Sequence, residues 1–179
     1  ISKKYNDKKI LLLTYNTKLR SETNKKIIKY KINNLECHTY HSFYYNYYDN
    51  KCCNDIILSK IIDENISPII DKSYHKYDMI ILDESQDISD LLFKSIKKCV
   101  NDFININSQF CILGDKYQNI FQFNYADNRF LINAEKCFNF INKLPFKKLN
   151  LSTTYRLTET MTTFINNCVL HKDENRKLI

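Results

Sequence analysis

The chain has 179 residues, which is enough for one hydrophobic core and at most the start of a second domain. Its 27 Lys and Arg outnumber its 20 Asp and Glu, and the net charge of +7 favours a polyanionic partner without proving one. No apolar run approaches the roughly 20 residues of a membrane-spanning helix and no signal peptide is visible, so we expect a soluble intracellular protein with no membrane partner.

Apolar runs predict the strands. In chain order these lie at residues 10–14, 35–39, 79–82, 110–113 and around 148–151. The run at 79–82 is continuous, as in a strand that is buried on both faces of a parallel sheet.

Between the strands, apolar residues recur with helical spacing. They predict helices at 17–30, 41–48, 55–63, 89–102, 133–141 and 158–170, with Thr17 as the N-cap of the first and a possible hairpin after Asp115. In the helix at 89–102, the residues expected to face inward are Leu91, Leu92, Ile96 and Val100. Strands that alternate with helices indicate an α/β fold with a mainly parallel sheet flanked by helices.

Several aromatic residues and cysteines fit structural roles. Tyr40 and Phe43 fit the core, and packing also accounts for Tyr44, Tyr45, Tyr47 and Tyr48. Seven cysteines, an odd number without framework spacing, indicate reduced thiols. A zinc site could be imagined from Cys37, His38, His41, Cys52 and Cys53, but no CxxC pair is present and we do not predict one.

The most informative segment is 77–87, where an apolar strand ends in Asp83 and Glu84. Acidic side chains just beyond the carboxyl end of a buried strand lie where open α/β sheets bind ligands. The first carboxylate can coordinate Mg²⁺, and the second can orient or deprotonate a water for attack on a γ-phosphate. Taken alone, such a pair is more often an acidic turn after a strand than a catalytic site.

Five short segments place this pair in a wider pattern. They are 13–18 (LTYNTK), 39–43 (TYHSF), 81–87 (ILDESQD), 113–123 (LGDKYQNIFQF) and 151–156 (LSTTYR). Their order resembles motifs Ia, Ic, II, III and IV of the UvrD/Rep family of superfamily 1 helicases, over residues 10 to about 165. The fourth segment resembles the DNA helicases of that superfamily more than its RNA-active members, so DNA is the expected track.

The resemblance implies a RecA-like P-loop NTPase motor that uses ATP and Mg²⁺. In it, Asp83 would bind Mg²⁺, Glu84 would act on the attacking water and Gln118 would sense the γ-phosphate. Arg156 would reach the γ-phosphate from a second motor domain. The DNA-binding residues implied by the resemblance are Tyr15, Lys18, Thr39, His41 and Phe123, the last as a ring that stacks on a base.

The chain departs from the family in three places. The phosphate-binding loop GxxxxGK[ST] is absent because Gly114 is the only glycine. We expect truncation just downstream of that loop, with a pseudoenzyme as the less favoured alternative. The insertion between the second and third segments has only the 34 residues 44–77 available, so it should be much reduced. Asn124 and Tyr125 replace the usual Arg-Gly.

Together these features predict most of a first motor domain at 1–148, with a reduced insertion at about 44–77, and the start of a second at 149–179. The expected function is part of an ATP-dependent DNA helicase that translocates on single-stranded DNA and unwinds duplex DNA, 3′ to 5′ by resemblance. The 179 residues alone are expected to be inactive. A non-catalytic DNA-binding remnant and the motor module of a helicase-nuclease remain as alternatives.

Overall fold

The computed structural model describes residues 2–70, 76–118, 125–141 and 145–170. By its internal contacts the chain divides into two compact units, Ile1–Lys143 and Leu144–Ile179. The assignment of 149–179 to a second motor domain stays a prediction. Within the described residues, no helix is long and apolar enough to cross a bilayer.

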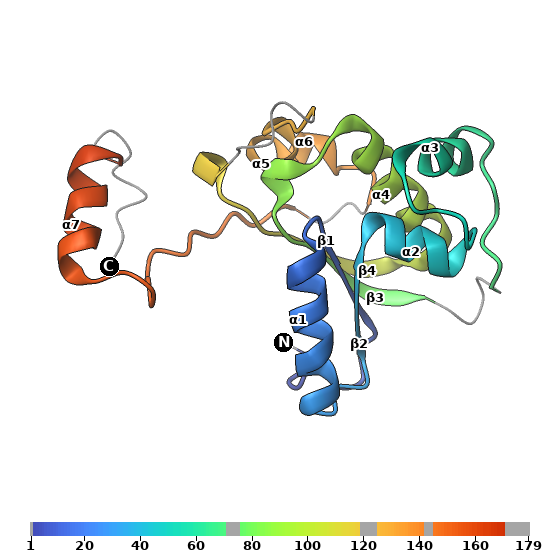
Figure 1. Ribbon diagram of the computed structural model, residues 1–179, viewed down its shortest axis with the longest axis horizontal. Coiled ribbons are helices and arrows are strands. Elements are labelled where there is room, and N and C mark those ends of the chain that lie inside the picture. Colours follow the sequence, from blue (N-terminus) through green and yellow to red (C-terminus); the bar gives the residue numbers. More distant parts are fainter. Residues whose placement is uncertain (1, 71–75, 119–124, 142–144, 171–179) are drawn as a thin grey trace. The chain divides into compact units, whose positions relative to one another are not determined.

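The described residues of the first unit form a four-stranded parallel sheet (Figure 1). Its strands are β1 (Ile10–Thr14), β2 (Leu35–Thr39), β3 (Tyr77–Leu82) and β4 (Ile104–Ile112), in the order β2-β1-β3-β4. All three pairs are parallel, and Leu12 of β1 lies opposite Cys37 of β2 and Ile81 of β3. The predicted α/β fold with a parallel sheet is confirmed.

Helices cover both faces of this sheet. The helices that enclose the main core are α2 (Tyr40–Tyr47), α3 (Asp55–Asp63) and α4 (Asp90–Phe103). On the other face, α1 (Thr17–Lys29) lies beside Cys37, whose carbonyl accepts from the Asn24 side-chain amide at 3.3 Å. The remaining helical elements are two short 3-10 turns, η1 (Ser85–Asp87) and η2 (Lys116–Gln118), followed by α5 (Arg129–Ile132) and α6 (Ala134–Cys137). The second unit contains α7 (Glu159–Cys168).

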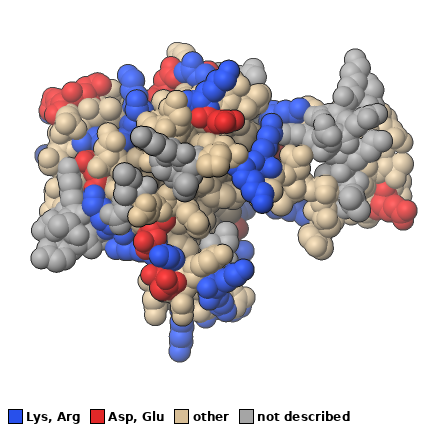
Figure 2. Space-filling model, turned by 180° about the vertical axis from the view of Figure 1, so that it is seen from behind, with Lys and Arg blue, Asp and Glu red and all other residues tan. Residues whose placement is uncertain are grey.

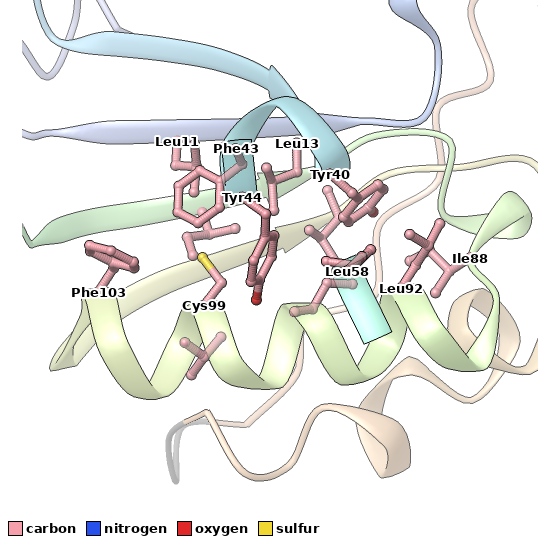
Figure 3. Packing of buried hydrophobic residues seen from close by; sticks show 14 of the residues in the cluster. Leu11, Leu13, Tyr40, Phe43, Tyr44, Leu58, Ile88, Leu92, Cys99 and Phe103 are labelled. Atoms are coloured by element: carbon pink, nitrogen blue, oxygen red, sulfur yellow. The ribbon is translucent and has the colours of Figure 1, made fainter. Parts of the chain in front are cut away.

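The core lies between the sheet and α4 (Figure 3). Leu11 and Leu13 point from β1 toward Phe43 and Tyr44 of α2, and Cys99 and Phe103 rise from α4 to meet them. The expectation that Tyr40, Phe43, Tyr44 and Tyr48 are packing residues is confirmed, because each is at most 3% exposed. Tyr45 is an exception, since it is exposed.

The segment after α2 is fastened to α4 by buried polar contacts. The Tyr48 hydroxyl donates to Asp102 Oδ2 at 2.7 Å, and Lys98 Nζ lies 3.2 Å from the same oxygen. Lys98 also donates to Asn65 Oδ1 at 2.8 Å, so one lysine joins α4 to the chain beyond α3. Because the Lys98 ammonium and the Asp102 carboxylate are both almost fully buried, each depends on the other for its neutralisation.

Three sequence predictions are wrong. The N-cap of α1 is Asn16 rather than Thr17, because Asn16 has an extended backbone and its Oδ1 accepts from the N–H groups of Lys18 and Leu19 at 2.8 and 3.2 Å. The helix expected at 133–141 is reduced to the four residues of α6, which α5 precedes across Asn133. The segment 148–151 is not a strand, since the described residues of its unit offer no partner strand.

Other boundaries also differ from the predictions. β4 begins at Ile104, six residues before the predicted start, because the prediction followed the continuous apolar run at 110–113 and the earlier residues of β4 include polar ones. The possible hairpin after Asp115 lies partly outside the described residues, and its described start is the 3-10 turn η2.

Candidate functional site

The candidate site lies at the carboxyl edge of the sheet. β1 leads into Tyr15, β3 into Asp83 and β4 into Gly114, and backbone hydrogen bonds hold these exits together. Asp83 N–H donates to the Leu13 carbonyl at 2.9 Å, and Ser85 N–H donates to the Leu113 carbonyl at 2.9 Å. The turn after β3 is therefore tied to both neighbouring strands.

The turn itself has an unusual backbone. Glu84 has φ 54 and ψ 46, in the left-handed region, and begins the 3-10 turn η1. A non-glycine residue in this region costs on the order of 1–2 kcal/mol, so the surrounding contacts must hold it there. One of them is local, because Glu84 N–H donates to Asp83 Oδ1 at 3.0 Å. The two carboxylates thus leave the strand in a fixed orientation.

Gln86 joins Glu84 to the segment after β4. Its amide nitrogen donates to Glu84 Oε2 at 2.7 Å, and its amide oxygen accepts from Asp115 N–H at 3.0 Å. Asp115 Oδ2 in turn accepts from the amide nitrogen of Gln118 at 3.2 Å. Three hydrogen bonds therefore connect Glu84 with Gln118, two residues that the sequence placed in one site. Gln86 is 1% exposed, so its two bonds are shielded from water.

A shallow hollow of about 390 Å³ opens at this edge. Its lining residues are Tyr15, Asn16, Thr17, Glu84, Gln86, Asp87 and Gln118. The structure thus brings Tyr15 together with Glu84 and Gln118. A second hollow of about 470 Å³ lies near the start of β3, and its lining contains none of the predicted site residues.

The carboxylates of the site carry uncompensated negative charge. Burial raises the pKa of Asp87 to about 6, and the neighbouring Glu84 charge adds to the rise. Burial and the Glu84 charge also raise the pKa of Asp83, against the hydrogen bond from Glu84 N–H. Among the described residues, no Lys, Arg or His forms an ion pair with Asp83, Glu84 or Asp87. The edge therefore favours a cation.

The donor set fits Mg²⁺ through one protein ligand. Asp83 offers a hard carboxylate oxygen, half-buried at the strand end. Within the part of the chain that the structure describes, no three His, Cys, Asp or Glu side chains converge to hold a metal, either here or around Cys52 and His41. Asp83 alone with water and phosphate oxygens is a usual arrangement for Mg²⁺, which keeps most of its waters.

Comparison with known families agrees with this geometry. Residues 51–139 match the model of the UvrD/REP helicase N-terminal domain. The chain belongs to the UvrD/Rep helicase family. A comparison with curated proteins gave no match.

The UvrD/Rep match contains Asp83, Glu84 and Gln118, and so covers the hydrogen-bonded part of the site. Tyr15 and Arg156 lie outside the matched residues. Their assignment continues to rest on the motif resemblance of the sequence.

Lys18, Thr39 and His41, which the UvrD/Rep resemblance also assigns to DNA binding, are not among the residues that line the hollow. Lys18 is exposed in the first turn of α1. The Thr39 hydroxyl caps α2 by accepting from Ser42 N–H at 3.3 Å. His41 Nε2 lies 2.9 Å from Asp55 Oδ1, so its ring is held toward the start of α3.

The positions of two predicted residues relative to this site are not given by the structure. Phe123 lies outside the described residues. Arg156 belongs to the second compact unit, where it is exposed and its N–H donates to Thr154 Oγ1 at 3.4 Å.

The sequence missed three residues of the site. Gln86 and Asp87 stood in the quoted segment without a role, and Asn16 was passed over in favour of Thr17. A buried amide is visible only when its partners are known, because Gln86 bonds a residue 29 positions away. For Asn16, its high preference at helix N-caps was an available signal.

Proposed function

We propose that this chain forms part of the motor of an ATP-dependent DNA helicase that moves along single-stranded DNA, 3′ to 5′, and unwinds duplex. The observation that carries the proposal is the hydrogen-bonded path from Glu84 through Gln86 and Asp115 to Gln118. It supports one unit that contacts both the attacking water and the γ-phosphate.

In this proposal each residue has a distinct task. Asp83 holds Mg²⁺, which supplies positive charge to the phosphates when ATP is bound. Glu84 orients the attacking water and accepts its proton, and Gln86 keeps the Glu84 carboxylate in place. Gln118 contacts the γ-phosphate, and Arg156 adds charge to the transition state when the two motor domains close.

Tyr15 supports the coupling of this chemistry to DNA. Its ring lines the same hollow as Glu84 and Gln118. Movement of a base against the Tyr15 ring would therefore shift the residues that act on ATP. The seven free cysteines favour a reducing, intracellular location.

The Glu84→Gln variant tests the proposal, in a protein that joins this chain to a phosphate-binding loop. The amide keeps the shape of the side chain but cannot accept the proton. We expect ATP binding within about twofold of the wild type and DNA-stimulated hydrolysis reduced by at least about 100-fold. Glu64→Gln is the matched control, because Glu64 is exposed and distant in sequence from the site.

A second function, that of a DNA-binding remnant, is favoured by one observation: the 179 residues contain no GxxxxGK[ST] loop. The 179-residue chain alone should therefore show no Mg²⁺-dependent ATP hydrolysis under either function. The two functions can be distinguished in a protein that includes the loop, because a remnant would bind single-stranded DNA without DNA-stimulated ATP hydrolysis. Wild-type turnover by Glu84→Gln would show that Glu84 is only a turn residue.

A further inference from the structure

The positive charge of the chain is concentrated near its beginning. Residues 1–31 contain ten Lys and Arg and two Asp and Glu, a net charge of +8. Residues 32–179 contain 17 and 18, a net charge of −1. A general preference for lysine would spread the excess along the chain. The concentration therefore has a local cause.

Most of this charge lies on α1. The helix contains Lys18, Arg20, Lys25, Lys26 and Lys29, against the single acidic residue Glu22. No residue of α1 is fully buried, and its partly buried positions face the sheet at β1 and β2. Lys18, Lys25 and Lys29 recur with helical spacing and are all exposed, so they form a stripe along the solvent side that only Glu22 interrupts.

The stripe runs away from the candidate site. It begins at Lys18, two residues after Asn16 in the hollow, and ends at Lys29. At 1.5 Å per residue, this spans roughly 16 Å along the helix. In Figure 2, basic side chains lie at the tip and along one side of the lower projection, where Figure 1 places α1.

The N-terminal segment adds to the far end of the stripe. Lys3 Nζ lies 5.3 Å from the centre of the Tyr30 ring, and Lys29 Nζ lies 5.6 Å from it. Lys4 Nζ lies 5.7 Å from the centre of the Tyr5 ring. Tyr5 and Tyr30 are 42% and 53% exposed, so aromatic and basic side chains alternate on an open surface.

These lysines differ from others nearby in having no acidic partner. Lys8 and Lys9 lie within 3.9 Å of the carboxylates of Asp7 and Glu36. By contrast, the described residues provide no ion pair for Lys3, Lys4, Lys18, Lys25, Lys26 or Lys29. Attraction to the carboxyl end of the helix accounts for Lys26 and Lys29, which lie in its last turn, but not for Lys3, Lys4 or Lys25.

We propose that this surface binds the phosphate backbone of a nucleic acid. We call it the α1 basic face, and it consists of Lys3, Lys4, Lys25, Lys26 and Lys29. It extends the contact beyond Lys18 and does not depend on the nucleotide site. A lipid surface is a poorer match, because the apolar positions Leu19 and Ile27 of α1 are turned toward the sheet and only Ile28 stands fully exposed.

The test measures binding of the 179-residue chain to fluorescein-labelled single-stranded and duplex oligonucleotides by fluorescence anisotropy, from low to moderate salt. Binding to anionic lipid vesicles is measured in parallel. The test variant is Lys25→Gln/Lys26→Gln/Lys29→Gln. The matched control is Lys51→Gln/Lys60→Gln/Lys94→Gln, which removes the same charge from three exposed lysines elsewhere. Circular dichroism confirms that each variant is folded, and glutamine keeps a good helix propensity.

If the α1 basic face binds phosphates, the plot of the logarithm of the binding constant against the logarithm of the salt concentration becomes less steep in the test variant alone. Loss of three phosphate contacts should reduce the magnitude of this slope by about 2 for a single strand and by about 3 for a duplex. Equal reductions in both variants would show that only net charge matters and would overturn the inference. So would binding that the test variant retains while Tyr15→Ala loses it, or a loss seen with anionic lipid vesicles but with neither oligonucleotide.

Discussion

A Cβ atom on Gly114 would lie 2.6 Å from the amide oxygen of Gln86, closer than any side chain could tolerate. The same atom would lie 3.1 Å from the Ser85 nitrogen and 3.1 Å from Leu131 Cδ2. The chain after β4 can therefore approach the turn after β3 only because residue 114 has no side chain. This approach is what allows Gln86 to bond Asp115 N–H.

Gly114→Ala should consequently displace Gln86 and destabilise the fold. We expect a loss of about 1–3 kcal/mol in the free energy of unfolding, measured by urea denaturation, because overpacking at a tight contact has this size. In Gly114→Ala/Gln86→Ala, the oxygen that causes the closest contact is gone, so the alanine at 114 should cost less there than in the wild type. Equal costs in the two backgrounds would contradict the contact.

Asp87→Asn should stabilise the fold at neutral pH and not at acid pH. The pKa of Asp87 is raised to about 6 in the folded chain, from an ordinary value of 3.8. Between these values the folded state binds more protons than the unfolded state, so the free energy of unfolding falls as the pH rises through this window. Above about pH 6 the full cost is present, at most about 3 kcal/mol.

The measurement compares wild type and variant by urea denaturation at pH 4 and pH 7.5. We expect Asp87→Asn to be more stable by about 1–3 kcal/mol at pH 7.5 and nearly equal at pH 4. Glu64→Gln, an exposed carboxylate, serves as the control and should show little difference between the two pH values. A stabilisation of the same size at both pH values would mean that the charge of Asp87 is not responsible.

Phe123→Ala and Arg156→Ala should separate DNA binding from hydrolysis in a protein with a complete nucleotide site. If Phe123 is a stacking ring, its loss weakens single-strand binding by roughly 1–3 kcal/mol with little dependence on the base. Arg156→Ala should spare DNA binding and abolish ATP hydrolysis. The readouts are anisotropy with single-stranded oligonucleotides and DNA-stimulated phosphate release. A Phe123→Ala protein that no longer folds would place the ring in the core.

The sequence predicts the parts of this fold in which a pattern repeats locally. The strands at 10–14 and 35–39 and the helix at 55–63 agree with β1, β2 and α3 at both ends. The end of β3 at Leu82, just before Asp83 and Glu84, also agrees, because the apolar run before it marks where the buried strand stops. Each of these features depends on residues within a few positions of one another.

Features that depend on distant partners could not be predicted in this way. Leu149 and Leu151 have the alternation of a strand, yet they are 74% and 90% exposed, because a strand forms only where another strand can pair with it. Gln86 shows the reverse case, as a polar residue that is buried because Glu84 and Asp115 surround it. Neither outcome is encoded in the neighbouring residues.

The clamp made by Tyr48, Lys98, Asp102 and Asn65 has a consequence for how the chain opens. If the insertion at about 44–77 moved independently of the sheet, its amide hydrogens would exchange through small local fluctuations. Here, releasing Asn65 or Tyr48 would leave Lys98 or Asp102 without a buried hydrogen-bond partner, which is unfavourable. The amides of α3 should therefore exchange only when α4 leaves the sheet, as one cooperative unit.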